Sequence, residues 1–145
     1  GLADLVEDLL ASRVLGFISM AMKSGHLALG YDQVKSAAQG EVFAWRIEAR
    51  DGSADGRSKI RVLTKAVSRE LEAPLPRVIG CFSAADLGAA LGREQIVHAA
   101  IKPGKLAAGL TRAAERLSGF RALVPAEWPD REHEDAGKRR RNSRS

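Results

Sequence analysis

Apolar residues recur at helical spacing along several stretches of the chain and predict helices that alternate with short strands. Residues 2–23 carry an apolar side chain at every third or fourth position, with acidic and polar residues between them. This spacing predicts one long amphipathic helix or two in sequence. Gly25 ends the pattern, and a short apolar stretch follows at residues 26–29. Gly30 then begins a second predicted helix, which extends to about residue 39.

The rest of the chain continues this alternation. Residues 42–49 alternate as a strand should, residues 50–56 form a predicted loop, and residues 57–71 a basic helix. Prolines break that helix before the apolar run 78–82, which suits a buried strand. Ser83 and Asp86 have the spacing of a capping box and predict a helix at 84–91 that Gly92 ends. Residues 96–101 form the fourth predicted strand, and Pro103 opens a last helix through residue 117.

This order of elements predicts an α/β fold with a mostly parallel sheet covered by helices on both faces. The chain has 145 residues, of which 45% are hydrophobic, so it suits one domain with one core. No run approaches the roughly 18 apolar residues of a membrane span. We therefore expect a cytoplasmic monomer that makes no contact with a membrane.

Charge is unevenly distributed near the C-terminus. We assign residues 1–120 to the domain, residues 121–137 to an acidic linker, and residues 138–145 to a disordered basic tail. The tail contains five bases and no acid, so it cannot bury apolar surface. Two interpretations of the tail stay open: a phosphate-binding arm and a solvated tail.

Residues with catalytic or metal-binding chemistry do not form a recognisable pattern. Cys81 is the only cysteine and lies in an apolar run, where a buried, inert thiol is expected. His26, His98 and His133 have no ligand spacing. No carboxylate is embedded in apolar sequence as a tuned acid would be. The glycines of residues 52–58 do not have P-loop spacing, which favours a turn. We expect no enzyme activity, no metal and no cofactor.

Several separated blocks give the chain a family likeness. They are Leu15 to Leu27 (LGFISMAMKSGHL), Gly30, Leu87 to Glu94 (LGAALGRE) and Ala99 to Ile101 (AAI). In this order they resemble the L-seven-Ae ribosomal-protein family of kink-turn RNA binders, and most of all its small bacterial YlxQ-like members. The chain is also similar to the second half of two-part proteins in which a YlxR-like domain comes first.

The resemblance implies a three-layer α/β/α sandwich with a central mixed sheet of about four strands. It also implies binding of structured RNA, above all ribosomal RNA, and a role in ribosome assembly or translation. Contact with ribosomal proteins is a further expectation. The implied site combines the start of the second helix with the loop before the last strand. Its residues are Lys23, Gly30, Tyr31, Asp32, Gln33, Lys35, Ser36, Gly92, Arg93, Glu94, Gln95 and Ile96.

Elementary chemistry is compatible with this site. A helix N-terminus offers unpaired N–H groups to phosphates, and Gly30 allows close approach of a nucleic-acid backbone. Asp32 and Gln33 offer hydrogen bonds to exposed base edges. Lys23, Lys35 and Arg93 offer positive charge to phosphates, and Ile96 offers an apolar cover for an unstacked base. Asp32 is equally acceptable as a simple helix-start residue.

One departure from the family alters the expected target. Kink-turn binders usually carry Asn-Glu where this chain has Asp32-Gln33. The carboxylate stands where an amide donor would contact a guanine edge, so another structured RNA is an alternative target. Two other functions stay open: a protein-interaction module on the same scaffold, and the recognition domain of an RNA-modifying protein.

Overall fold

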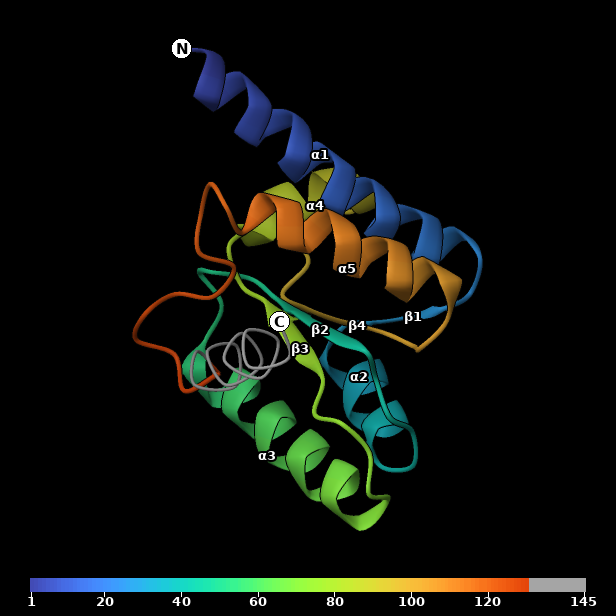
Figure 1. Ribbon diagram of the computed structural model, residues 1–145. Coiled ribbons are helices and arrows are strands. Elements are labelled where there is room, and N and C mark those ends of the chain that lie inside the picture. Colours follow the sequence, from blue (N-terminus) through green and yellow to red (C-terminus); the bar gives the residue numbers. More distant parts are fainter. Residues whose placement is uncertain (131–145) are drawn as a thin grey trace, which may run out of the picture.

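The computed structural model of the chain describes residues 1–130, which form three layers. One helical layer contains α1 (Leu2–Lys23), α4 (Ala84–Leu91) and α5 (Lys105–Leu117), and the other contains α2 (Tyr31–Ala38) and α3 (Ala54–Glu70). Between them lies a sheet of β1 (Leu27–Leu29), β2 (Trp45–Glu48), β3 (Arg77–Ile79) and β4 (His98–Ile101). Figure 1 shows the two helical layers on opposite faces of this sheet. The predicted α/β fold is confirmed.

The prediction that the sheet is mostly parallel is wrong. Its strand order is β1-β4-β2-β3, and only the pair β2 and β3 is parallel, whereas β4 runs antiparallel to both of its neighbours. The cause is the place of the last strand. A chain that alternates helices and strands gives parallel neighbours when each strand is added beside the previous one. Here β4 is inserted between β1 and β2, in the opposite direction.

The third helix begins earlier than its sequence predicts. The glycine and aspartate content of residues 54–56 predicts a loop, yet these residues form the first turn of α3. Ser53 is the reason, because its side chain accepts a hydrogen bond from the backbone N–H of Gly56 at 3.4 Å. Serine at this position satisfies a donor that the first helical turn leaves unpaired.

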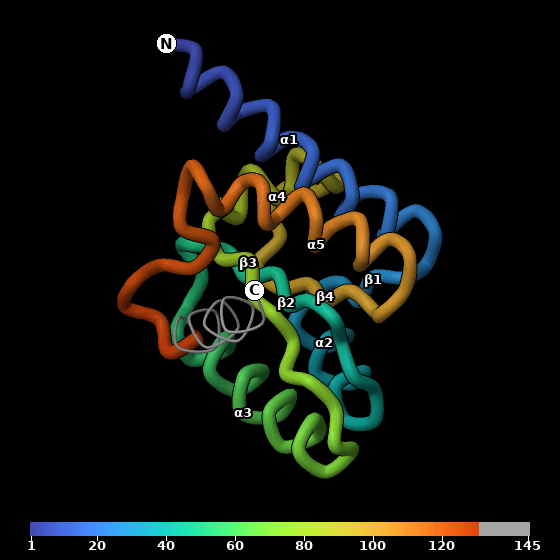
Figure 2. The backbone as a smooth tube through the Cα atoms, in the orientation of Figure 1, coloured from blue at the N-terminus to red at the C-terminus, as the bar shows by residue number. Residues whose placement is uncertain are grey.

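The segment predicted as an acidic linker belongs to the domain as far as residue 130. Leu123, Val124 and Trp128 are buried and belong to the large apolar cluster of the core. The N–H of Gly80, directly after β3, donates to the carbonyl of Leu123 at 2.6 Å. Figure 2 shows this segment leaving α5 and running past β3 towards the start of α3. Residues 131–137 and the predicted tail at 138–145 lie outside the described residues.

The two faces of the sheet differ in chemistry. On the α1, α4 and α5 side, Trp45, Ile47 and Ile101 join a large apolar cluster. The opposite side has a smaller cluster that includes Val34, Phe43 and Ile60. The same side of β2 also carries Arg46 and Glu48, since alternate residues of a strand point to opposite faces. A charged group therefore lies buried under α3.

Candidate nucleic-acid interface

The fold brings the two predicted binding segments to one end of the sheet. The N–H of Gly30, at the start of α2, donates to the carbonyl of His98 at 2.8 Å. His98 is the first residue of β4, so the loop at residues 92–97 lies directly before it. The start of α2 and this loop are thus held together by backbone pairing between neighbouring strands.

The start of α2 is shaped by Gly30 and Gln33. Gly30 has φ 89° and ψ 160°, a conformation that side chains of L-residues rarely adopt. Gln33 Oε1 accepts a hydrogen bond from the N–H of Leu29 at 3.1 Å, so this amide keeps its NH₂ group for other partners. The first-turn N–H groups of α2 have no acceptor within the helix. Asp32, exposed beside them, interacts favourably with the positive end of the helix dipole.

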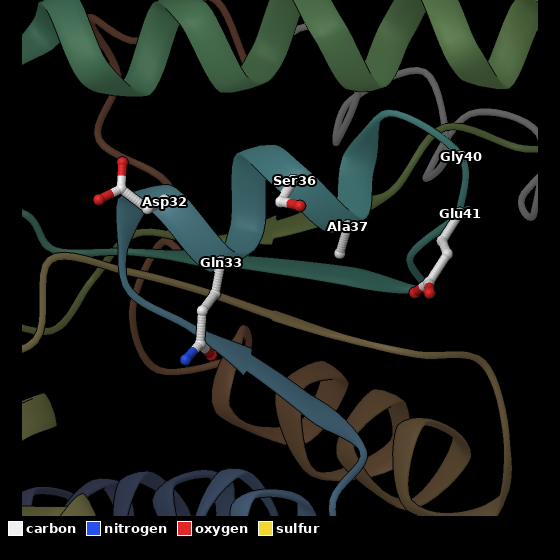
Figure 3. Close-up of a pocket in the computed structure, with 6 residues that line it drawn as sticks. All are labelled: Asp32, Gln33, Ser36, Ala37, Gly40 and Glu41. Atoms are coloured by element: carbon white, nitrogen blue, oxygen red, sulfur yellow. The ribbon is translucent and has the colours of Figure 1, made fainter.

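A shallow groove follows α2 from its first turn to its C-terminal end. It is lined by Asp32, Gln33, Ser36, Ala37, Gly40 and Glu41. Figure 3 shows Gln33 pointing from the helix towards β1, with Glu41 at the far end of the groove. Glu41 lies 3.7 Å from Lys102 Nζ, so its carboxylate is partly neutralised. The predicted residues Asp32, Gln33 and Ser36 therefore share one surface.

Aromatic and cationic side chains lie at the same helix start. Tyr31 packs edge-on against His98, with 5.6 Å between the ring centroids. The Lys35 ammonium lies 5.9 Å from the centre of the Tyr31 ring, within the range of a cation–π interaction. Both residues were predicted for the site. The ring of Tyr31 therefore contacts both the exposed Lys35 and the buried His98.

The loop before β4 is positioned by tight packing on α4. Gly92 ends α4 in the left-handed conformation (φ 70°), and the N–H of Arg93 donates to the carbonyl of Gly88 at 2.8 Å. A β-carbon at position 88 would lie 2.6 Å from the carbonyl oxygen of Glu94. Only glycine permits this approach of helix and loop. The predicted residues Gly92, Arg93, Glu94 and Gln95 are exposed.

Two predicted residues do not belong to this surface. Ile96 is only 7% exposed and packs in the main core, and its N–H donates to the carbonyl of Ala84. It cannot cover a base as predicted, because the loop turns its side chain inward. Lys23 ends α1 and precedes β1, whereas Gly30 follows β1. The three residues of that strand span roughly 10 Å, so Lys23 lies at the opposite end of β1 from the loop.

The sequence analysis missed the contribution of α3 to this end of the sheet. A β-carbon at Gly56 would lie 3.0 Å from His98 Nε2 and 3.8 Å from the Tyr31 ring, so the first turn of α3 borders both. One turn further along, Lys59 Nζ lies 2.9 Å from Asp55 Oδ2, and this hydrogen bond raises the pKa of Lys59. The signal in the sequence was Ser53, a helix-cap residue followed by small residues.

Buried charges underlie the same surface. Arg46 donates to Asp130 at 2.6 Å and to Glu48 at 3.0 Å. Oε2 of Glu48 lies 2.5 Å from Nδ1 of its cross-strand partner His98. Glu48 is thus a buried carboxylate, 2% exposed, that its sequence context did not indicate, and its partners are charged or polar. Within residues 1–130, Arg46 Nε and Asp130 Oδ2 are buried without a hydrogen-bond partner. The guanidinium of Arg57 stacks on Trp128 at 3.8 Å, above this group.

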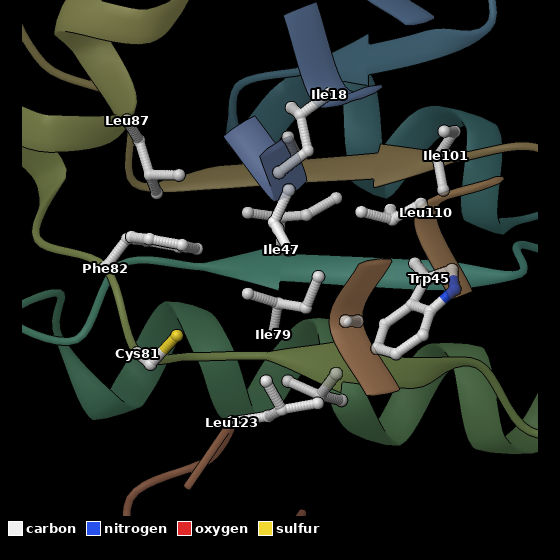
Figure 4. Close-up of a cluster of buried hydrophobic side chains, with 14 of the residues drawn as sticks. Ile18, Trp45, Ile47, Ile79, Cys81, Phe82, Leu87, Ile101, Leu110 and Leu123 are labelled. Carbon is white, nitrogen blue, oxygen red and sulfur yellow. The ribbon is translucent and has the colours of Figure 1, made fainter. Parts of the chain in front are cut away.

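Cys81 lies away from this surface, among the buried side chains shown in Figure 4. Burial raises the pKa of its thiol, and this effect outweighs the neighbouring Arg121 and Arg50, which act in the opposite direction. A protonated, buried thiol is a poor nucleophile. The start of α2 and the loop before β4 offer helix N–H groups, the amides of Gln33 and Gln95, and charged side chains, which suit hydrogen bonding and charge interactions.

Comparisons with known proteins support the fold. No family model and no curated protein matches the chain. Among solved structures, the chain is similar to a protein of unknown function from Bacillus halodurans, with a TM-score of 0.56 and 20% identity. The match covers 71% of this chain and 97% of the other. Within residues 1–130, no helix has the length and apolar character to cross a membrane. At this identity, the likeness to the solved structure shows a shared α/β architecture.

Proposed function

We propose that the protein binds structured RNA through the start of α2 and the loop at residues 92–95. The observation that carries this proposal is the hydrogen bond from Gly30 to His98, because it holds the start of α2 beside the first residue of β4, which the loop precedes. Unpaired N–H groups at the start of α2 suit phosphate oxygens. The NH₂ group of Gln33 and the carboxylate of Asp32 suit base edges, which a bulge or loop in RNA exposes.

The mixed charge of this surface favours selective over general binding. Lys35 and Arg93 supply positive charge, whereas Asp32 and Glu94 repel phosphates that come too close. A purely electrostatic binder gathers cations without such carboxylates. The proposed target is therefore an RNA whose backbone passes Lys35 and Arg93 while an unpaired base reaches Asp32 and Gln33. A kink-turn and a ribosomal RNA loop both fit this description.

A salt-dependent titration tests the proposal. Binding of the full chain to a kink-turn RNA is compared with binding to a plain duplex of equal length, and both are repeated with a chain that ends at Gly137. We expect selectivity for the kinked RNA with either chain. Joint replacement of Asp32, Gln33 and Arg93 by alanine should remove that selectivity.

The matched control replaces Asp8 and Lys65 by alanine, one exposed acid and one exposed base on α1 and α3. This pair leaves the net charge unchanged, as the triple replacement does. It should leave the selectivity intact. Equal, weak binding to both RNAs that vanishes when residues 138–145 are removed would contradict the proposal.

A protein-interaction module is the second candidate, and one observation favours it. Leu2, Leu5 and Leu9 on α1 are 78%, 57% and 63% exposed, and acidic residues surround them. Figure 1 shows this half of α1 projecting beyond the sheet. Apolar side chains at this spacing suit a contact with another protein. Replacement of Leu5 and Leu9 by aspartate should leave RNA selectivity unchanged if RNA binding is the function.

A further inference from the structure

Three arginines converge on a small cavity between α1 and α5, on the opposite side of the sheet from α2. Arg13 comes from α1, and Arg112 and Arg116 come from successive turns of α5. The cavity measures about 70 Å³, and Phe17, Gly109 and Ala113 complete its lining. Its volume is roughly that of two water molecules, which occupy about 30 Å³ each in the liquid.

The helices that form the cavity pack closely. A β-carbon at position 109 would lie 2.4 Å from Cε1 of Phe17, so the Phe17 ring of α1 packs directly on the backbone of α5. Gly109 and Ala113 are buried, and α1 packs along α5 over much of its length. The arginines therefore extend from two fixed backbones. The three arginines are themselves exposed and reach the cavity from these two helices.

Unlike three other arginines of residues 1–130, the arginines of this cavity have no acidic partner in that part of the chain. Arg46, Arg77 and Arg121 form ion pairs with Asp130, Glu115 and Glu7, respectively. Within residues 1–130, no carboxylate lies within 4.0 Å of Arg13, Arg112 or Arg116. Arg112 and Arg116 are four residues apart on one helix face, where like charges repel. An anion bound among the three would remove this repulsion.

We infer that this cavity binds a phosphate group. The planar guanidinium group presents paired N–H donors that match phosphate oxygens, and three such groups can surround one phosphate. The cavity is too small for a nucleoside, so the ligand inserts only its phosphate. The phosphate belongs either to an RNA backbone or to a free phosphate anion. This site is separate from the proposed RNA surface at α2.

Amide NMR of the full chain with inorganic phosphate tests the inference, at constant ionic strength with chloride as the reference anion. We expect saturable shifts at Phe17, Gly109 and Ala113. The double replacement R112Q/R116Q should abolish them. The control K65Q/R69Q removes two exposed cations from α3 and should retain them. Shifts that do not saturate, or that persist in R112Q/R116Q, would overturn the inference, and thermal melts verify that both variants fold.

A second titration, with duplex RNA, identifies the source of the phosphate. If RNA supplies the phosphate, the duplex shifts the resonances of the same amides. The slope of log K against log salt concentration for duplex binding should then be smaller in magnitude by about 0.9 in R112Q/R116Q, the value for one lost phosphate contact. If inorganic phosphate shifts these amides and the duplex does not, a free anion is the ligand. No shift with either probe overturns the site. The triple replacement at Asp32, Gln33 and Arg93 should leave the phosphate shifts intact, which separates this test from that of the proposed function.

Discussion

At the scale of single residues, the most constrained side chain is that of Arg46. Its guanidinium group is 2% exposed and touches the carboxylates of Asp130 and Glu48, and it also donates to the carbonyl of Arg57 at 3.3 Å. Burial of each of these charges alone would be costly, and the group is stable because its members neutralise one another. The Arg46 side chain therefore links β2 to α3 and to residue 130 by hydrogen bonds.

Replacement of Arg46 by methionine should destabilise the protein by about 3–5 kcal/mol, because two carboxylates would stay buried without a cation. Urea unfolding measures the loss. The control, Lys59→Met, breaks the exposed pair with Asp55 and should change stability by less than about 1 kcal/mol. A loss below 1 kcal/mol for Arg46→Met would contradict the importance of the buried pairs.

Cys81 predicts a dependence of stability on alkaline pH. Burial raises the pKa of its thiol in the folded state, so the unfolded chain loses this proton at a lower pH, near 8.5. The stabilising effect of the neutral thiol is complete below that pH and is lost as the pH rises through the folded-state pKa. Relative to Cys81→Ala, the wild type should lose stability above about pH 8.5, as measured by unfolding at pH 7, 9 and 10. A constant difference between the two proteins would contradict this prediction.

At the scale of elements, the contact between α4 and the following loop determines the shape of the proposed RNA surface. A β-carbon at position 88 would meet the carbonyl oxygens of Glu94 and Arg93 at 2.6 and 2.8 Å. These are backbone atoms, which cannot turn away as a flexible side chain can. The loop and the helix can separate only if the loop moves as a whole.

Gly88→Ala should therefore displace the loop, with a stability loss of about 1–3 kcal/mol and loss of RNA selectivity. Gly16→Ala is the control, since its β-carbon would meet nothing within 4 Å. That change in the interior of α1 should stabilise the protein by about 0.5–1 kcal/mol. Unfolding and the kink-turn titration measure both effects. Unchanged selectivity in Gly88→Ala would show that the loop is not required.

The segment after α5 packs against the chain at the end of β3. Leu123 pairs with the backbone beyond β3, and the Trp128 ring lies over Gly80, where a β-carbon would come within 2.3 Å of it. An uncovered strand at the edge of a sheet is a site of self-association. The segment protects this edge while it contributes buried apolar surface.

A chain that ends at Gly119 should therefore melt at a lower temperature than one that ends at Asp130, and it should self-associate. Loss of Trp128 alone, by replacement with alanine, should cost about 3–5 kcal/mol. Thermal melts and light scattering measure these effects. The control truncation at Asp130 retains every described residue. Equal stability of the two truncated chains would contradict the assigned role of the segment.

At the scale of the whole molecule, local patterns in the sequence predict more than its long-range pairing. The helix at residues 84–91 has the predicted bounds because Ser83 and Gly92 mark its ends within the sequence itself. The order of the nine elements of residues 1–130 also follows from local periodicity. The position of β4 between β1 and β2 depends on contacts between distant residues, and no local pattern contains this information.

For the candidate surface too, local features could be predicted from the sequence and long-range contacts could not. The start of α2 could be predicted because a glycine begins a helix there, and its likeness to the family indicated the second loop. The inward turn of Ile96 could not be predicted, because an apolar residue next to an exposed loop can point either into the core or towards solvent. The burial of Glu48 depends on α3 above it and on Arg46, whose second partner is 84 residues away in sequence.

That separation has a consequence for synthesis of the chain. Ribosomes add about 5–20 residues per second, so Arg46 waits roughly 4–17 s before residue 130 has been added. During this interval the nascent sheet has Glu48 but not Asp130 beside its buried cation, and the strand edge at β3 is still uncovered. Formation of the ion pair between Arg46 and Asp130 is therefore a late event in cotranslational folding.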